Sequence, residues 1–483
     1  MKILNRKLHQ SKNRPIKILQ FGEGNFLRAF IDWFIQELND KTDFNGNICV
    51  VQPLPYGRIN ELEKQDGLYT LLLEGIDKGK LITNKHVIDV LSDFINPYEQ
   101  WNEYLEYAKS EDLKLIISNT TEAGIAYDNT DLDETKTSPT YPGKLLTFLK
   151  KRYDYFNGSK ESGLHILPCE LIDYNGTTLK EILNKLSNNR NYSNEFVKWL
   201  NNANLFYNTL VDRIVPGYPK NQIEQLQQEN NYIDYNIVKG EIFHLWVIEG
   251  NPIIKEILPI EETDLNIIVT NNVKPYKERK VKILNGAHTC MVPIAYQCGI
   301  RSVYEMMNTD YLYNYLYHFL KDEVWTSVAL PQNEIEQFSN AVMERFMNPT
   351  IYHELLSISL NSMTKYKTRI LPSAIAYYEK NKQLPKRSLF SLAALFVMYS
   401  LKDGESSIIK DDEQFITMWE NLWNQNDVSH LVHEVMSLDH WAYNFNTMKG
   451  SFDFVIECVN DILQTSMKEA LVKHFKDYEN TTY

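Results

Sequence analysis

The feature that most constrains the fold is an apolar strand that runs directly into a glycine turn near the start of the chain. Residues 16–21 are apolar at alternate and adjacent positions, and the turn Gly-Glu-Gly-Asn follows at 22–25. From residue 25 to about residue 38, apolar residues recur with helical spacing, and a second apolar strand lies at 48–51. Strand, glycine turn, helix and strand in this length predict a βαβ unit.

The glycine turn is a candidate dinucleotide site. Glycines let the backbone approach a pyrophosphate, and a helix N-terminus attracts its negative charge. The fingerprint is incomplete, because the third position after Gly24 is Leu27 instead of glycine, and a lone G-x-G pair is weak evidence. The candidate cofactor-binding residues in this turn are Gly22, Glu23, Gly24, Asn25 and Phe26.

Two further strand ends supply candidate cofactor contacts. The second strand ends at Gln52-Pro53, where an acidic residue would normally hold the adenine ribose, so cofactor preference stays open. Arg58 lies nearby and could meet a 2′-phosphate, although a solvated loop charge is the simpler interpretation. Strand 113–118 ends in a polar turn containing Thr121 and Glu122, and ligands of open α/β sheets bind at such ends. We expect this turn to border a nicotinamide.

Residues 280–288 carry the candidate catalytic group. On an α-helix at about 100° per residue, Lys280, His288 and Asn285 lie at roughly 0°, 80° and 140°, whereas Lys282 points away. A lysine in an apolar site can exchange a proton with a carbonyl or alcohol oxygen, while the amide and imidazole stabilise the developing charge. Such a set suits carbonyl–alcohol interconversion without a metal. Taken alone, these residue types on a helix are more often surface residues or a buried histidine with satisfied hydrogen bonds.

Composition limits the class of protein and its partners. With 483 residues, 43% hydrophobic and 23% charged, the chain can bury a large core, and we expect two domains, at 1–274 and 275–483. Long helical patterns dominate the second. The net charge of −13 argues against nucleic acid, which is bound through clustered Lys and Arg. A small-molecule substrate is the expected partner.

Cysteine usage and the termini predict a cytoplasmic protein. The five cysteines are scattered and form no C-x-x-C pair, which is typical of reduced thiols. The N-terminus is too polar to start a secretory signal, and the apolar run 389–401 is too short to span a bilayer, so we expect a buried helix there and no membrane partner. His430, His433 and Glu434 lack the zincin order, and no metal is expected there.

Two segments are candidates for substrate binding. Asp212 and Arg213 lie in an apolar frame, where a structural ion pair is about as plausible as a catalytic role. Lys365, Lys367 and Arg369 concentrate three cations ahead of a proline. Cations near a cleft would suit an anionic substrate, with solvated charges on an exposed helix face as the alternative.

These motifs together resemble the polyol-specific long-chain dehydrogenases, the mannitol dehydrogenase family. The resemblance rests on residues 22–29, 121–124 and 211–216 and on Lys280-x4-Asn285-x2-His288, and it covers almost the whole chain. Residues 21–30 and 167–176 are most similar to the subgroup that interconverts D-tagaturonate and D-altronate. The resemblance implies an α/β protein with a Rossmann-like N-terminal domain, a mainly α-helical C-terminal domain, an active site between them, NAD(H) as cofactor and no catalytic metal.

The resemblance also implies roles for single residues. Lys280 becomes the general acid/base, and Asn285 and His288 hold the substrate oxygen during NADH-dependent reduction of tagaturonate in hexuronate catabolism. The substrate carboxylate gives Lys365, Lys367 and Arg369 a task, and Asp212 remains a further substrate contact.

One position departs from the family pattern. Polyol-oxidising relatives often carry an asparagine two residues after the cysteine that matches Cys169, whereas this chain has Leu171, with Asn175 as the candidate replacement. Three alternatives stay open: fructuronate as substrate, an uncharged polyol such as mannitol, and a non-catalytic NAD(H)-binding sensor. Use of NADPH and the oligomeric state are also open at this point.

Overall fold

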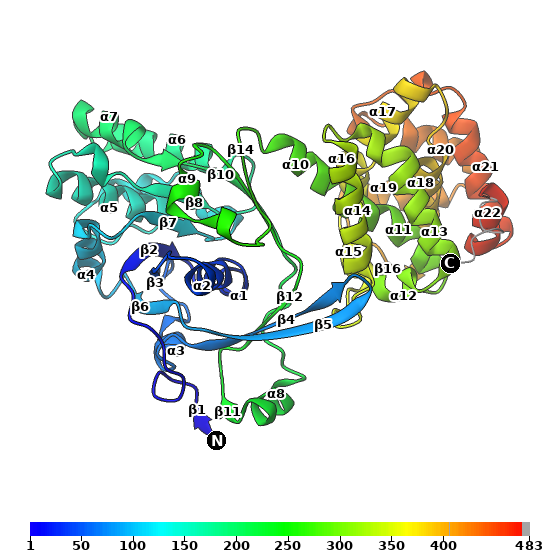
Figure 1. Cartoon of the computed structure of the whole chain (residues 1–483). Coiled ribbons are helices and arrows are strands. Elements are labelled where there is room, and N and C mark those ends of the chain that lie inside the picture. The colour runs from blue at the N-terminus through cyan, green and yellow to red at the C-terminus, as the bar shows by residue number, and fades with distance from the viewer. Residues whose placement is uncertain (405, 476–483) are drawn as a thin grey trace. The chain divides into compact units, whose positions relative to one another are not determined.

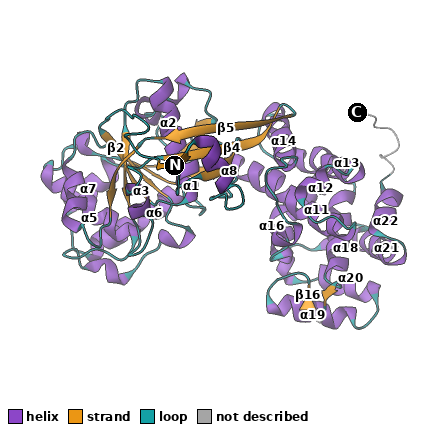
Figure 2. Cartoon of the chain, turned by 90° about the horizontal axis from the view of Figure 1, so that it is seen from below, coloured by secondary structure: helices purple, strands orange, loops and turns teal. Residues whose placement is uncertain are grey.

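The structure, a computed structural model, describes residues 1–404 and 406–475 (Figure 1). The chain divides into two compact units, Met1–Val273 and Lys274–Tyr483. The boundary expected from the sequence lies one residue further along. Figure 2 shows that the first unit holds most of the strands and that the second is built mainly of helices. The predicted α/β class, with a helical C-terminal part, is confirmed.

A parallel sheet of six strands forms the centre of the first unit. Its order is β6-β3-β2-β7-β8-β9, and every neighbouring pair is parallel. β2 and β7 are central, and their residues are buried or half-buried because helices cover both faces of the sheet. The order reverses beside β2, and ligands of such sheets bind at the carboxyl ends next to this point. The strands are β2 (Ile16–Phe21), β3 (Asn47–Val51), β6 (Leu91–Ile95), β7 (Leu115–Ser118), β8 (His165–Pro168) and β9 (Leu205–Phe206).

The helix after the glycine turn is shorter than the sequence predicts. The predicted helix from residue 25 to about 38 is divided into α1 (Asn25–Ala29) and α2 (Ile31–Lys41) by Phe30, whose φ of −123° is not helical. Phe30 lies in the core, stacked on Phe26 and edge-on to Phe34, so packing of its ring accompanies the break. The other α-helices of this unit are α3 (Ile59–Glu63), α4 (Trp101–Glu106), α5 (Tyr141–Tyr155), α6 (Asn175–Asn189), α7 (Asn194–Asn202), α8 (Ile223–Asn230) and α9 (Ile254–Ile257).

Two smaller sheets complete the first unit. One has the order β10-β13-β14 and the other β12-β4-β5, in which β4 and β5 form the long hairpin visible in Figure 1. The chain is not a strand between β12, which ends at Glu241, and β13, which begins at Leu245, and the carbonyls of Ile242 and Phe243 there accept hydrogen bonds from Arg213. The strands are β4 (Tyr69–Asp77), β5 (Lys80–Ile88), β10 (Asn208–Asp212), β12 (Val238–Glu241), β13 (Leu245–Glu249) and β14 (Ile267–Thr270), with a small pair β1 (Lys2–Ile3) and β11 (Tyr232–Ile233).

The second unit is organised around two buried helices, α11 (Gly286–Gln297) and α18 (Lys386–Met398). Ser391 Oγ donates to the Cys290 carbonyl at 3.0 Å, and Gln297 Nε2 donates to the Ala394 carbonyl at 2.8 Å. The buried helix predicted over 389–401 is therefore present as α18. Among the described residues, no helix is long and apolar enough to cross a membrane.

Further helices surround this pair. They are α10 (Lys274–Arg279), α12 (Val303–Met307), α13 (Asp310–His318), α14 (Gln332–Phe346), α15 (Leu355–Ile358), α16 (Ser362–Arg369), α17 (Leu371–Asn381), α19 (Glu413–Trp423), α20 (Val428–Met436), α21 (Ser451–Gln464) and α22 (Met467–His474), with π-helical segments η6 (Lys280–Asn285) and η7 (Phe319–Val324) and a strand pair β15 (Lys402–Asp403) and β16 (Ser406–Ser407).

A buried carboxylate fixes the start of α18. Glu323, from η7, accepts a hydrogen bond from the Arg387 N–H at 2.7 Å and two from Ser388, at its N–H and hydroxyl. Burial raises the pKa of Glu323 against the lowering effect of these hydrogen bonds. The first turn of a helix has N–H groups without helical partners, and this carboxylate satisfies two of them.

Replacing Glu323 by alanine should lower the free energy of unfolding by about 3 kcal/mol, because buried donors at the start of α18 lose their acceptor. Urea unfolding followed by circular dichroism measures the change. Glu379→Ala, at an exposed position of α17, is the matched control and should change stability by less than about 0.5 kcal/mol. Equal effects of the two substitutions would contradict the capping role.

Candidate active site

The glycine turn lies between three strand ends of the parallel sheet. Gly22 has a φ of +120°, and a Cβ there would lie 2.9 Å from the Asn119 carbonyl oxygen, so only glycine fits. The Gly22 N–H donates to the Val51 carbonyl, and the Asn119 N–H donates to the Phe21 carbonyl. A Cβ on Gly24 would meet no atom within 4 Å. The turn is thus tight at its first glycine and open at its second, as close approach of a pyrophosphate requires.

The next two residues of the turn hold it to its surroundings. Asn25 Oδ1 accepts a hydrogen bond from the buried Arg28 guanidinium at 2.7 Å, and the other face of the Asn25 amide lies against Gly217. Phe26 is half-buried and stacks on Phe30 at a centroid distance of 5.0 Å. The side chains of Asn25 and Phe26 therefore fix the turn to the protein interior.

A buried carboxylate that the sequence analysis did not single out fixes the loop after β7. Glu170 follows β8 and accepts hydrogen bonds from the Thr120 N–H and hydroxyl at 2.9 Å and from the Ser118 hydroxyl at 3.0 Å. Burial raises its pKa, against these hydrogen bonds. Thr121 has a φ of +72°, and its side chain and that of Glu122 are exposed. The signal available in the sequence was a charged residue directly after an apolar strand.

Asn175 has a structural role. It is fully buried, and its Nδ2 donates to the carbonyls of Pro168 and Glu170 while its Oδ1 accepts from the Thr209 N–H. Both ends of the amide are engaged with the main chain at the ends of β8 and β10. Leu171, at the position where polyol-oxidising relatives often have asparagine, is 62% exposed. The geometry gives Asn175 no spare atom for the substrate oxygen.

Asp212 and Arg213 are both buried at the end of β10. The Arg213 guanidinium lies 4.1 Å from the Trp33 ring and donates to the carbonyls of Ala29, Ile242 and Phe243. Burial lowers the pKa of Arg213 to about 9. Arg213 therefore connects α1 to the segment between β12 and β13. Of the two residues, Asp212 remains the candidate for substrate binding.

The candidate catalytic residues lie on a π-helical turn that continues into α11. The sequence analysis assumed a regular α-helix from Lys280 to His288, and this was wrong: Lys280–Asn285 is π-helical, and the α-helix begins at Gly286. The i→i+5 bonding of a π turn leaves no mark in apolar periodicity and is frequent at functional sites. A Cβ on Gly286 would lie 3.2 Å from the Arg369 carbonyl oxygen, so this glycine permits close packing of α11 on α16.

Within this turn the two lysines differ in surroundings. Lys282 Nζ donates to the Ser327 carbonyl at 2.6 Å and pairs with Glu278 at 3.3 Å, which engages it away from α11. Lys280 and Asn285 are half-buried at the two ends of the π turn, and His288 follows one turn into α11.

His288 is a buried imidazole with an unsatisfied nitrogen. It is 9% exposed, stacks on Phe346 at 4.4 Å and meets His353 edge-on at 4.9 Å. Burial lowers its pKa well below the ordinary value, and His353, Arg345, Arg369 and Lys365 lower it further. Its Nε2 is buried without a hydrogen-bond partner among the described residues. A polar atom of this kind fits an oxygen of a bound ligand.

The positive charges of Arg345, Lys365 and Arg369 lower the pKa of His288. These three residues are called the cation group below. Lys365 and Arg369 are four residues apart on α16 and share one helix face, whereas Lys367 falls on another. Arg369 donates to the Thr289 hydroxyl at 3.3 Å, one residue beyond His288. Burial lowers the pKa of Lys365 and of Arg369. The structure thus places two of the three predicted cations, Lys365 and Arg369, near His288. It also places Arg345 there, which the sequence analysis missed.

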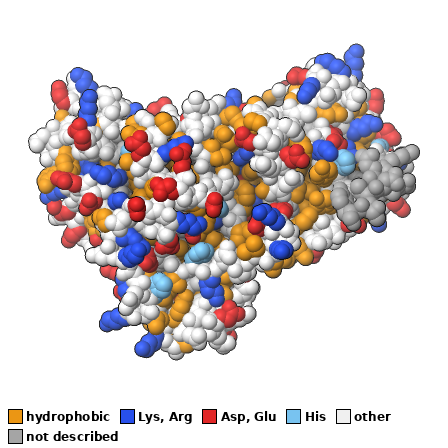
Figure 3. Space-filling model, viewed as in Figure 1, with side chains coloured by type: hydrophobic (Ala, Val, Ile, Leu, Met, Phe, Trp, Pro, Cys, Tyr) orange, Lys and Arg blue, Asp and Glu red, His pale blue; other side chains and the backbone are white. Residues whose placement is uncertain are grey.

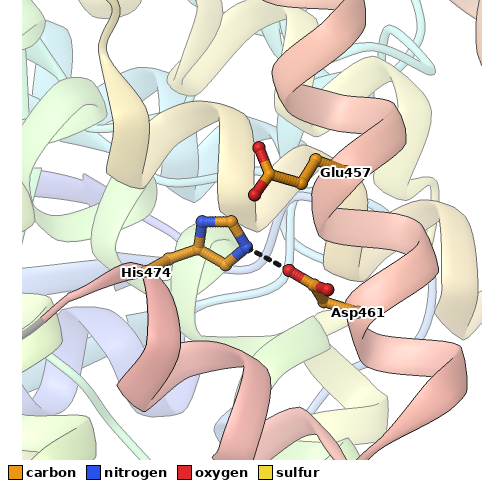
Figure 4. Close-up of side chains that lie close together, drawn as sticks. All are labelled: Glu457, Asp461 and His474. Atoms are coloured by element: carbon orange, nitrogen blue, oxygen red, sulfur yellow. Dashed lines mark hydrogen bonds and ion pairs between the residues drawn. The ribbon is translucent and has the colours of Figure 1, made fainter.

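A cluster of possible metal ligands lies elsewhere in the second unit. Glu457 and Asp461 of α21 face His474 of α22, and Asp461 bonds the His474 ring at 2.7 Å (Figure 4). Lys473 Nζ donates to both Asp461 oxygens at 2.7 Å, so an ammonium already neutralises this carboxylate. The cluster joins α22 to α21 by ion pairs. His430 and His433 are exposed on α20.

Surface charge is mixed. On the face in Figure 3, acidic and basic side chains are interspersed over each unit, with apolar side chains between them. On the described part of this face, acidic side chains lie among basic ones and do not form one acidic patch.

Comparison with known families agrees with these two units. Residues 16–262 match the Mannitol dehydrogenase Rossmann domain, and residues 272–462 match the Mannitol dehydrogenase C-terminal domain. The chain belongs to the mannitol dehydrogenase family, which confirms the resemblance. It is an NAD-dependent oxidoreductase acting on CH–OH groups.

Curated relatives extend over the whole chain. Altronate oxidoreductase of Escherichia coli strain K12 is 40% identical over 479 residues, covering 98% of this chain and 99% of the relative. The same enzyme from Enterobacter sp. strain 638 and from Shigella flexneri gives the same values.

Two solved structures share the fold. A substrate-free D-sorbitol dehydrogenase has a TM-score of 0.82 at 20% identity, covering 97% of this chain and all of that one. The Pseudomonas fluorescens mannitol 2-dehydrogenase ternary complex with NAD and D-mannitol has a TM-score of 0.68 at 20% identity, covering 99% of this chain and all of that one. At this identity the likeness shows the fold alone.

His288→Phe should make the free energy of unfolding depend less steeply on pH below about 6.5. A histidine whose pKa is lowered by folding binds its proton more readily when unfolded, so its stabilising effect is lost as pH falls below about 6.5. Phenylalanine keeps the stack on Phe346 and removes one titrating group, so the slope between pH 6.5 and 5 should fall by up to about 1.4 kcal/mol per pH unit.

Unfolding free energies from urea titrations across this range measure the slope. Burial lowers the pKa of His165 and of His244 to about 4, so part of the slope remains in the variant. His430→Phe, on the exposed face of α20, is the control and should leave the slope unchanged. An unchanged slope in His288→Phe would mean that folding does not lower the pKa of His288.

Proposed function

We propose that the chain catalyses the reversible NADH-dependent reduction of D-tagaturonate to D-altronate, in the cytoplasm and as a step of hexuronate catabolism. The observation that carries the proposal is the buried, unsatisfied Nε2 of His288 beside the cation group. A sugar acid has both an oxygen for this nitrogen and a carboxylate for the cations. The altronate oxidoreductases, 40% identical over almost the full length, support the same substrate.

The cofactor turn fits a dinucleotide. Gly22 allows the tight turn and Gly24 leaves the main chain open at the carboxyl end of β2, where the sheet order reverses. A nicotinamide held at this turn would supply the hydride for the keto carbon of the substrate. Thr121 and Glu122, exposed on the loop that Glu170 fixes, are the proposed contacts on the nicotinamide side.

The proton comes from the π turn. Lys280 donates it to the carbonyl oxygen as the hydride adds to carbon, so that ketone becomes alcohol, and it takes the proton back in the reverse direction. Asn285 and the Nε2–H of neutral His288 donate hydrogen bonds to the same oxygen and stabilise its charge. Because burial keeps His288 uncharged, it can do this without competing with Lys280 as proton donor.

The substrate carboxylate is the proposed partner of the cation group. Guanidinium–carboxylate pairs are shorter and stronger than neutral hydrogen bonds, and partial burial strengthens them further. Arg369 and Lys365 share one face of α16, and Arg345 is buried near His288. A substrate carboxylate can accept charge-assisted hydrogen bonds from Lys365 and Arg369, which an uncharged polyol cannot, and this makes tagaturonate a better fit than mannitol. Fructuronate has the same carboxylate and differs only in stereochemistry.

Lys280→Ala should lower kcat with tagaturonate by about 10²–10⁴-fold, because the oxygen loses its proton donor. The Kd for NADH should stay within about twofold of the parent value. NADH oxidation at 340 nm measures turnover, and Lys282→Ala, two residues away and engaged with Ser327, is the matched control. Retained turnover in Lys280→Ala would remove the residue from the acid/base role. NADH binding by the parent protein without turnover of any ketose or uronate would instead favour a sensor.

Arg369→Gln should raise KM for tagaturonate by about 10–100-fold, because a charge-assisted hydrogen bond is worth roughly 1.5–3 kcal/mol. Turnover of an uncharged ketose such as fructose, however slow, should change little. Lys367→Gln removes the same charge from another face of α16 and serves as the control. A loss in Lys367→Gln as large as that in Arg369→Gln would place Lys367 at the carboxylate as well.

A further inference from the structure

The second strand of the dinucleotide fold ends without an acidic residue. In NAD-binding folds this position holds an Asp or Glu that accepts hydrogen bonds from the adenine ribose. Here it is Gln52, which is buried and donates from Nε2 to the Leu54 carbonyl at 2.9 Å. Two prolines, Pro53 and Pro55, follow within three residues. The strand end itself therefore supplies no carboxylate.

A carboxylate reaches the same place from the glycine turn. Glu23 Oε1 accepts a hydrogen bond from the Arg58 N–H at 3.2 Å, across 35 residues of sequence. A Cβ added to Gly57 would collide with Glu23 Oε1 and with Gln52 Oε1. The Glu23 carboxylate, the Gln52 amide and the loop after β3 thus meet at one point, the carboxyl end of β3. This is where the ribose of a bound dinucleotide lies in the fold.

Arg58, a cation close to this point in the chain, is already paired. Arg58 Nε and a terminal nitrogen bond Glu61 Oε2 at 2.7 and 2.6 Å, and both side chains are partly exposed. The Arg58 guanidinium therefore faces α3, while only its main-chain N–H faces Glu23. Burial raises the pKa of Glu23, whereas the Arg58 N–H and the charges of Arg28 and Arg58 lower it.

We propose that Glu23 is the residue that selects NAD(H) over NADP(H), by accepting hydrogen bonds from the adenine ribose hydroxyls. Its two oxygens match the two donors of a vicinal diol. A 2′-phosphate in the same place would put a second anion beside this carboxylate in a partly buried site, which is unfavourable. The proposal concerns nucleotide binding alone and does not depend on the identity of the sugar substrate.

The test is nucleotide binding without any sugar. Tryptophan fluorescence titrations with NADH and with NADPH give the two Kd values for the parent protein and for Glu23→Gln, which keeps the shape and removes the charge. We expect the Kd for NADH to rise about 5–30-fold and that for NADPH to fall about tenfold, since one charge-assisted bond and one repulsion are removed. Glu63→Gln, an exposed glutamate of α3, controls for the change in net charge.

A selectivity ratio in Glu23→Gln within twofold of the parent value, with an unchanged Tm, overturns the proposal. If Glu23→Gln lowers the Tm by several degrees, Glu23→Asp decides, because it keeps the charge on a shorter side chain. Weaker NADH binding without a gain in NADPH binding by Glu23→Asp supports the role, and unchanged binding of both overturns it. Failure of the tagaturonate assay would leave all of these binding results intact.

Discussion

Burial of helix α11 is the constraint on which the second unit depends. From Gly286 to Ala295 every residue is buried, so the helix has no solvent-exposed face. Close packing on all sides therefore fixes its position. Ser391 and Gln297 tie it to α18, and Glu323 in turn fixes the start of α18. His288 is placed by this packing, since its Nε2 has no hydrogen bond to any residue that the structure describes.

Burial among cations also determines what His288 can do. An imidazole of ordinary pKa would be partly charged near pH 6.5, but the low-polarity site and the cation group favour its neutral form. The positive charge near α11 is therefore carried by Arg345, Lys365 and Arg369. A charge on guanidinium does not vary across physiological pH, so attraction for an anion does not depend on the imidazole.

Local patterns in the sequence carried much of the fold and part of the candidate site. The strand and glycine turn at 16–25 and the buried helix at 389–401 follow from periodicity and glycine placement, and both are present. The division of the first helix at Phe30 and the π turn at Lys280–Asn285 were not predictable this way, because both depend on tertiary packing. Residues that act through distant partners were also missed.

Glu170, Arg345 and the role of Asn175 belong to this class. Glu170 bonds Ser118 and Thr120, Asn175 bonds Thr209, and the charge of Arg345 acts on His288. A single sequence can show an unusual residue, but it does not show which distant residue that side chain meets. The positions of Lys365 and Lys367, by contrast, could be predicted from the sequence. Residues two apart on a helix lie on different faces. Helical projection of the three cations could have separated them before the structure was known.

The carboxylate of Glu170 has a consequence for the thermodynamics of the proposed contact between this loop and the cofactor. By bonding Ser118 and Thr120 it orders the loop after β7 in the free protein, so the main chain there loses little conformational entropy when a ligand arrives. Fixing a loop residue on binding would otherwise cost about 1–2 kcal/mol. Affinity gained in this way requires no additional contact with the ligand. The energetic cost of burying the carboxylate is met once, when the first unit folds.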